Sequence, residues 1–245
     1  MTPYFCDLHI HSCLSPCADD DMTPANIAGM AALNGLQIVA LTDHNTAANC
    51  PPFFAHAKRL GLIPVGGMEL TTAEDIHAVC LFPDLDGTMS FDTFVAGRRC
   101  KIPNRVDIFG NQFLMNEEDE VCGTIPELLI PATALSLTEA HAEVTKRGGV
   151  LYPAHIDRTS NGILAILGEL PPAPVFTAYE LHDKESAERL TKKHTDLSDL
   201  VRTVSSDAHH LWDIAEAKFA LSLPDEPYSS DRVRRALISR LRGES

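Results

Sequence analysis

Basic residues are scarce in this sequence. Lys and Arg together number 20 whereas Asp and Glu number 34, so the formal net charge is −14 at pH 7. A surface of that sign does not attract nucleic-acid backbones in general, and we expect no stable nucleic-acid partner. A nucleotide or short oligonucleotide stays open as a substrate, because bound cations can reverse the field inside a cleft.

Long apolar runs are also missing. No segment is long and apolar enough to span a membrane, and the first residues lead into a strand pattern instead of a signal peptide. The seven cysteines are odd in number and scattered along the chain. Without an export signal they are typical of reduced thiols. The sequence therefore predicts a cytoplasmic protein.

Glycine-rich phosphate loops are absent as well. None follows the first strand, as a dinucleotide-binding domain needs, and there is no P-loop. What is present is an alternation of strand-like and helix-like runs, which implies a parallel sheet. About seven such units in 245 residues fit a single α/β barrel better than a doubly wound sheet. The predicted strands cover residues 4–10, 36–42, 62–70, 76–82, 150–154, 175–181 and 201–205, with a further strand at 218–223.

Helices are predicted between these strands, and one segment interrupts the rhythm. The first helix begins near residue 23 and runs to residues 34–35, and the others cover residues 51–60, 136–147, 162–170, 184–193 and 230–242. From about residue 87 to 131 the chain is mixed, with a helix at 91–99 and a hairpin that joins 107–114 to 120–124. We interpret residues 1–245 as one domain in which 87–131 is an insertion or cap.

Two histidines separated by one residue end the first predicted strand. Side chains alternate along a strand, so His9 and His11 point to the same side, and the carboxylate of Asp7 is near. Two imidazoles aimed at one point begin a metal site. On this fragment alone the pair is equally compatible with ordinary strand histidines.

Further ligand-type residues follow the other strands. Nearly all lie where a predicted strand ends, which is the face where parallel α/β proteins place their active sites. Imidazole and carboxylate suit zinc, iron and manganese better than magnesium. There are more of them than one tetrahedral ion uses, and a carboxylate such as Glu69 can bridge two ions. The set comprises Asp43, His44, Glu69, His77, His155, Asp207 and His209.

Five short motifs in order carry a family resemblance. They are His9-Ile10-His11-Ser12, Thr42-Asp43-His44, Gly67-Met68-Glu69, Pro153-Ala154-His155 and Ser206-Asp207-Ala208-His209. Together they resemble the motifs of the PHP (polymerase and histidinol phosphatase) superfamily, from Asp7 to about Trp212. The resemblance implies a distorted (β/α)7, TIM-like barrel that binds up to three divalent metal ions. It also implies hydrolysis of phosphate esters by a metal-bridging hydroxide.

The resemblance also assigns ligands to the three ions. His9 and His11 would join Glu69 and Asp207 at the first ion. Glu69 would bridge to a second ion held by His77 and His155, and the third would be held by His44 and His209. Asp43 resembles a residue that orients an imidazole through its other ring nitrogen; the alternative is a helix N-cap.

One position departs from the family pattern. Many relatives supply a further third-ion ligand a few residues after the second histidine, where this chain has Pro16 and Cys17, followed by three aspartates. Either Cys17 binds as a thiolate, or Asp19 or Asp20 reaches the ion, or the third site is weak. A solvated acidic loop explains these residues equally well.

Fewer residues can be assigned to substrate binding than to metal binding. Arg158 follows His155 on the same loop, and its planar fork suits a phosphate, although a surface ion pair is the alternative. The leaving group would take its proton from His209, His155 or a metal-bound water, which the sequence does not rank. We expect a small phosphorylated substrate; the oligomeric state stays open.

Two other functions compete with a phosphoesterase. One is a non-catalytic, metal-stabilised scaffold or binding module, which the altered Cys17 region favours. The other is a hydrolase of the amidohydrolase type that cleaves C–N bonds. Those barrels also open with two spaced histidines, but they place a lysine at a later strand end, and none stands there in this chain.

Overall fold

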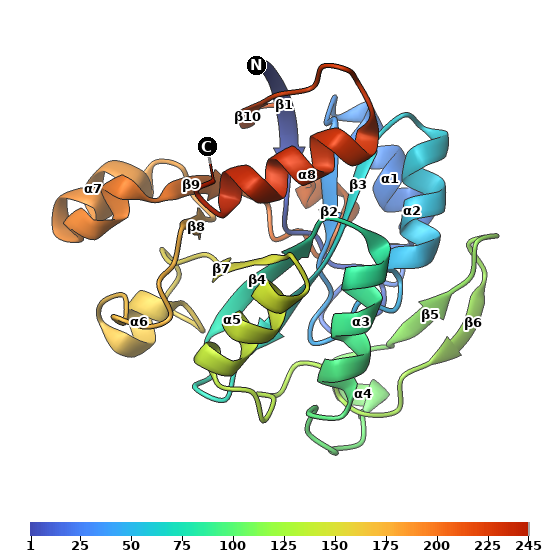
Figure 1. The fold of residues 1–245 in the computed structure, drawn as a ribbon. Helices are drawn as coiled ribbons and strands as arrows, with labels where there is room; N and C mark the ends of the chain where they lie inside the picture. The colour runs from blue at the N-terminus through green and yellow to red at the C-terminus, as the bar shows by residue number, and fades with distance from the viewer. Residues whose placement is uncertain (245) are drawn as a thin grey trace.

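The computed structural model describes residues 1–244 as a mixed α/β fold around a curled sheet (Figure 1). Its strands are β1 (Thr2–Asp7), β2 (Ile38–Leu41), β3 (Ile63–Thr71), β4 (His77–Phe82), β7 (Val150–Pro153), β8 (Ala178–Leu181), β9 (Val201–Val204) and β10 (Ala220–Leu223). Six of these form one sheet in the order β10-β1-β2-β3-β4-β7, and β8 pairs with β9 separately. The small sheet continues the curl, because β8 packs beside β7 and the chain just after β9 returns to the chain just after β1 through a parallel bridge between Ala208 and Ile10. The predicted TIM-like, distorted barrel is confirmed.

Strand direction differs from the prediction at two places. The strands β4 and β10 are antiparallel to their neighbours, whereas a parallel sheet was predicted. Between β3 and β4 the chain turns within a few residues, and Thr72 N donates to Ile76 O at 2.9 Å. A turn of that length cannot carry a crossover helix, so the second strand must run back along the first.

The helices occupy the predicted positions between strands, with small shifts at their ends. They are α1 (Pro24–Leu33), α2 (Cys50–Arg59), α3 (Leu85–Ala96), α5 (Leu137–Lys146), α6 (Ile163–Leu167), α7 (Ser186–Lys193) and α8 (Ser230–Leu241). The helix predicted at 91–99 begins earlier, since the Asp84 carboxylate caps it by accepting from Gly87 N at 2.8 Å. No helix within residues 1–244 is long and apolar enough to cross a membrane.

The core has two parts, one on each face of the main sheet. Phe53, Met68 and Phe91 belong to the part that α1, α2, α3 and α5 cover. On the other face, Tyr152 and neighbouring strand residues pack with Leu237 of α8, which lies across β3 and β10. The sheet is therefore apolar on both faces, and polar side chains are left for the strand ends.

Residues 87–131 contain most of α3, the short α4 (Val106–Phe109) and a hairpin of β5 (Phe113–Met115) and β6 (Val121–Thr124). The hairpin was predicted, but its first strand was placed too early, since residues 106–109 form a helical turn. Figure 1 shows the hairpin extending from the body of the molecule. Its base is tied to the loop that follows His11, because Phe113 N donates to Cys13 O at 2.9 Å. It is also tied to the start of α2, because the Asn49 amide donates to Phe113 O at 3.0 Å.

Candidate metal centre

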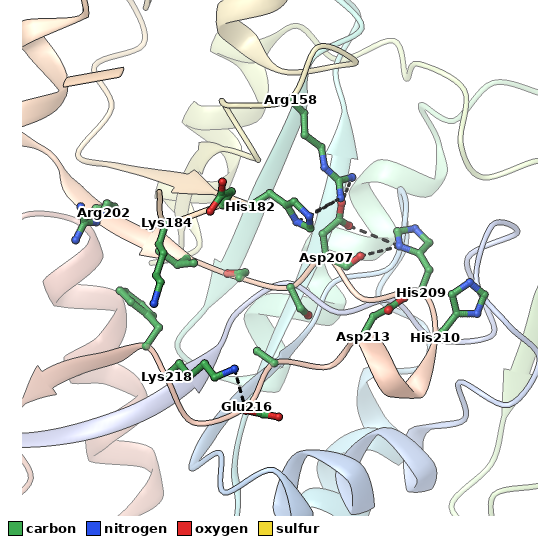
Figure 2. Close-up of a pocket in the computed structure, with 16 residues that line it drawn as sticks. Arg158, His182, Lys184, Arg202, Asp207, His209, His210, Asp213, Glu216 and Lys218 are labelled. Carbon is green, nitrogen blue, oxygen red and sulfur yellow. Dashed lines mark hydrogen bonds and ion pairs between the residues drawn. The ribbon is translucent and has the colours of Figure 1, made fainter. Parts of the chain in front are cut away.

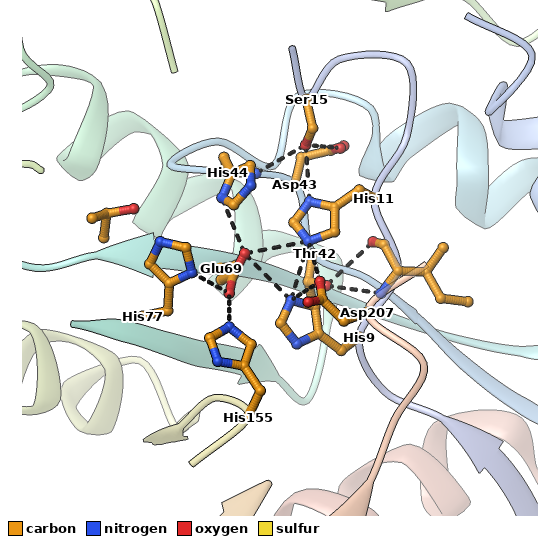
Figure 3. Close-up of polar contacts among 12 residues, drawn as sticks. His9, His11, Ser15, Thr42, Asp43, His44, Glu69, His77, His155 and Asp207 are labelled. Atoms are coloured by element: carbon orange, nitrogen blue, oxygen red, sulfur yellow. Dashed lines mark hydrogen bonds and ion pairs between the residues drawn. The ribbon is translucent and has the colours of Figure 1, made fainter. Parts of the chain in front are cut away.

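His9 and His11 lie just beyond the end of β1, on extended chain. Two hydrogen bonds hold that chain in strand-like register: Asp207 N donates to His9 O, and His11 N donates to Ala208 O, both at 3.0 Å. The two imidazoles consequently point to the same side, as the spacing predicts, and both are fully buried (Figure 3).

The other predicted ligand residues converge on the same point (Figure 3). His44 lies beside Glu69 through a parallel bridge that extends the pairing of β2 with β3. Unlike the other candidate ligands, His77 lies near the beginning of its predicted strand, residues 76–82, and not where a strand ends. Because β4 is antiparallel, its first residue pairs with Thr71 at the end of β3, and His77 thereby reaches the same edge.

Four ligand atoms form the first compact group: Nε2 of His9 and His11, Oε2 of Glu69 and Oδ1 of Asp207. His9 Nε2 is 3.1 Å from His11 Nε2 and 3.4 Å from each carboxylate oxygen. His11 Nε2 is 3.3 Å from Glu69 and 3.1 Å from Asp207. A tetrahedral ion with bonds of about 2.1 Å separates its ligand atoms by about 3.4 Å. The space between these four atoms, which we call the cage, therefore suits an ion with bond lengths like those of zinc.

The protons around this cage are arranged to leave lone pairs facing inward. The Nδ1 atoms of His9 and His11 lie 2.8 Å from Glu180 Oε1 and 3.0 Å from Ser15 Oγ. Ser15 Oγ gives its own proton to Asp43, at 2.7 Å, so it accepts from His11. With both Nδ1 atoms donating, both Nε2 atoms carry lone pairs, and the two carboxylates are acceptors. The donor set therefore fits a divalent ion such as zinc, iron or manganese.

Without a metal ion, protons on the histidines would balance the negative charge of the buried carboxylates. Burial by itself lowers the pKa of His11, but the Asp207 and Glu69 carboxylates outweigh burial and raise this pKa to about 9. Burial would raise the pKa of Asp207, but the two histidines hold it well below the usual range. By contrast, burial lowers the pKa of His44 to about 4 and that of His209 to about 3. These last two imidazoles are therefore neutral at pH 7 and able to bind a metal.

Glu69 stands at the centre of the cluster. Its Oε1 lies 2.8 Å from His77 Nδ1 and 3.0 Å from His155 Nε2, while Oε2 lies 3.0 Å from His44 Nδ1. The carboxylate is 1% exposed, and Oε2 accepts no hydrogen bond from residues 1–244. The two oxygens thus face different sets of imidazoles, which is the arrangement of a bridging ligand. The second compact group is His44, Glu69 and His77. His155 faces Oε1, as His77 does, but lies outside that group.

A third compact group consists of His11, His44 and His209, and in residues 1–244 no such group includes Cys17, Asp19 or Asp20. Cys17 is exposed. The carboxylate of Asp19 lies 3.4 Å from His210 Nδ1, and that of Asp20 accepts from the Asn111 amide at 2.9 Å. The structure thus brings His11, His44 and His209 together, and a third-ion ligand among Cys17, Asp19 and Asp20 stays a prediction.

Asp43 acts on His11 through an intermediary. It accepts from Ser12 N and Ser12 Oγ at 2.6 Å each, and from Ser15 Oγ, which in turn contacts His11. No helix begins at Asp43, since α2 starts at Cys50, so the N-cap alternative is wrong. Ser15 is the residue of this network that sequence reasoning missed. Glu180 lies in β8, within the strand predicted at 175–181, a position from which it was a candidate to enter the cleft but not to bind a metal; in the structure it contacts His9 Nδ1.

Arg158 lies at the rim of the cluster. Its Nη1 is 2.5 Å from Asp207 Oδ2, and the side chain is 39% exposed. It lines a cavity of about 140 Å³ together with Glu69, His77, His155 and His209. A half-exposed guanidinium beside buried ligand atoms can contact a molecule that enters this cavity, which a remote surface ion pair cannot do.

Comparison with known proteins identifies similar chains. The model of the PHP domain family matches residues 7–210. The error-prone DNA polymerase of Symbiobacterium thermophilum is 35% identical over 77 residues, which are 31% of this chain and 7% of the polymerase. The lesion-specific endonuclease of Pyrococcus furiosus has a TM-score of 0.66 at 17% identity, over 100% of this chain and 57% of its own. A Bifidobacterium adolescentis protein assigned as a metal-dependent phosphoesterase has a TM-score of 0.58 at 20% identity, over 87% and 88% of the two chains. This chain therefore spans only part of the polymerase and of the endonuclease.

Proposed function

Because this chain belongs to the PHP domain family, we propose that it is a metal-dependent hydrolase that cleaves phosphate esters. The observation that carries the proposal is the buried Glu69 carboxylate, whose two oxygens each face imidazoles at 2.8–3.4 Å. Divalent ions bound there would supply an activated water and neutralise the charge that develops on a phosphate.

The ligand assignment follows the family pattern, and its first ion coincides with the first compact group. The first ion would be held by His9, His11, Glu69 and Asp207. Glu69 would bridge to a second ion with His77 and His155. His44 and His209 would hold a third, weaker ion, because the Nε2 of His11 already faces the first one.

Arg158 would orient the substrate. Its guanidinium donates to Asp207 from the rim, and its exposed part has donors left for a phosphate oxygen. His155 Nε2 faces Glu69, and His209 Nδ1 lies 2.8 Å from the carbonyl of Asp207, so its Nε2 is left for a metal. This geometry favours water over either histidine as the source of the leaving-group proton.

The substrate that we propose is a nucleotide or a short oligonucleotide. One structural neighbour is endonuclease Q, solved with a 27-mer duplex substrate that carries an abasic lesion. The net charge of −14 opposes a long polyanion, whereas the local cations can hold a short one.

Turnover by the metal-loaded protein tests this function. We expect zinc, iron or manganese to be retained after purification without chelator and to support hydrolysis of a phosphate ester, but not of an amide. Elemental analysis and a phosphate-release assay measure the two quantities. Turnover of the amide alone would point to a C–N hydrolase, and bound metal without turnover of either would point to a scaffold.

Replacing Arg158 by methionine should weaken catalysis and leave the ligands in place. We expect kcat/KM for a phosphate ester to fall roughly 10²-fold or more, since one charged donor to the reacting phosphate is lost. Arg189→Met, at an exposed position of α7, is the matched control and should keep full activity. An unchanged kcat/KM in Arg158→Met, with unchanged metal content, would remove Arg158 from the phosphate site.

A further inference from the structure

The guanidinium of Arg158 contacts two different side chains beside the metal centre (Figure 2). Its Nη1 donates to Asp207 Oδ2 at 2.5 Å, and Asp207 presents its other oxygen, Oδ1, to the cage. Its Nη2 lies against the imidazole of His182, the residue that follows β8. Arg158 is thus held by a candidate metal ligand on one side and by His182 on the other.

The contact with His182 is made by the face of the ring and not by one lone pair. Nη2 of Arg158 lies 3.3 Å from Nδ1 and 3.4 Å from Nε2 of His182. A hydrogen bond along one lone pair would leave the other ring nitrogen much farther away. A position in the ring plane at these equal distances would collide with a ring carbon, so Nη2 lies over the face of the imidazole. A guanidinium packs well on such a face, because both groups are planar.

The turn that carries His182 is fastened to the residue that precedes Arg158. The Asp157 carboxylate accepts from His182 N at 2.9 Å and from Asp183 N at 2.8 Å. The side chain of His182 is exposed, and an exposed side chain on a free loop would not keep one position. Both oxygens of one carboxylate therefore hold the imidazole in register with the neighbouring guanidinium.

His182 lies on the side of Arg158 that faces away from the metal centre. Arg158 and Asp207 line both the cavity of about 140 Å³ at the centre and a larger cavity of about 810 Å³ beside it, whereas His182 lines only the larger one. The imidazole thereby occupies space into which the guanidinium would turn if it left the centre. Contacts on two sides restrict an arginine side chain that otherwise has many rotamers.

We propose that His182 is a positioning residue, whose ring packs on the Arg158 guanidinium and keeps it at the metal centre, ready for a phosphate oxygen. The inference rests on the proposed function. A guanidinium carries several N–H donors, and Asp207 takes only one of them, so donors remain for a ligand. Small displacements of a group that binds the reacting phosphate cost rate steeply, so an Arg158 without its support would act less well.

A double-mutant cycle on kcat/KM for p-nitrophenyl phosphate tests this role. We expect His182→Ala to lower kcat/KM roughly tenfold, whereas His182→Phe, which keeps a flat ring, should stay within roughly threefold of wild type. Asp157→Ala should also lower kcat/KM, because it releases the turn that carries the imidazole. In the Arg158→Met background, where no guanidinium is left to position, His182→Ala should change kcat/KM by less than roughly twofold.

His194→Ala, at the end of α7 and outside both cavities, is the matched control and should keep the wild-type kcat/KM. Elemental analysis should give the same metal content for every variant. Equal kcat/KM in wild type and His182→Ala would overturn the inference and leave the phosphoesterase intact. An undiminished effect of His182→Ala in the Arg158→Met background would overturn it as well, since His182 would then not act through Arg158.

Binding of inorganic phosphate to the metal-loaded protein, measured by calorimetry, gives a readout that does not depend on turnover. We expect His182→Ala to bind phosphate roughly tenfold more weakly than wild type, and His182→Phe to bind it nearly as well. If no phosphate ester is cleaved, the proposed function fails, and this measurement still decides about His182. Equal affinity of wild type and His182→Ala, or no binding by wild type, would overturn the inference.

Discussion

Glu69→Gln is expected to abolish hydrolysis, with kcat/KM reduced by at least roughly 10³-fold and less metal bound per chain. Each Glu69 oxygen faces imidazoles from a different set, so this one carboxylate serves two ligand groups. An amide keeps the shape but removes the negative charge that would hold the proposed cations in this buried site. Stabilisation of a phosphoryl transition state by metal is worth several kcal/mol, and every 1.36 kcal/mol is tenfold in rate.

The assay for this variant is phosphate release together with elemental analysis of the purified protein. Glu169→Gln, at an exposed position between α6 and β8, is the matched control and should behave as wild type. Wild-type activity in Glu69→Gln, with the same metal content, would contradict both the bridging role and the location of the reaction.

Metal removal is expected to lower the melting temperature by about 10 °C or more. A ligand present at 1,000 times its dissociation constant stabilises the folded state by about 4 kcal/mol, and for a chain of this size 1 kcal/mol shifts Tm by about 2–4 °C. The reason lies in the cage, where His9 Nε2 is 3.1 Å from His11 Nε2 and two carboxylate oxygens stand beside them. A cation between these atoms relieves the repulsion between their lone pairs.

Differential scanning calorimetry of chelated, native and remetallated protein measures this shift. Chelator saturated with zinc is the control for effects of the reagent, and Glu69→Gln should show a much smaller shift than wild type. An identical Tm for the chelated and the native protein would mean that protons alone hold the cluster together, and the centre would then not be a metal site.

Much of the candidate site follows from residue chemistry and short spacing. The two histidines of the first motif share a side because a strand has a period of two. Imidazole and carboxylate side chains stand where strand patterns end. The hairpin after Gly110 and the capped α5 follow from equally local signals, a polar turn between strand-like runs and Ser136 paired with Glu139.

Other features depend on which strands pair and in which direction, and a local pattern does not contain that information. His77 reaches the centre only because β4 runs antiparallel to β3. Glu180 reaches His9 across 171 positions of the sequence, at 2.8 Å. The direction of a strand is decided by the length of the turn before it and by the apolar faces that it buries, which are properties of the assembled sheet.

The sequence by itself determined the ligand types, their order and the α/β class, because these depend on side-chain chemistry and on periods of a few residues. Only the tertiary structure decided that Glu69 divides its oxygens between two sets of imidazoles, and that His11 lies close to both His44 and His209. The physical reason is that the distances between side chains far apart in sequence are set by sheet curl and strand separation, not by any single segment.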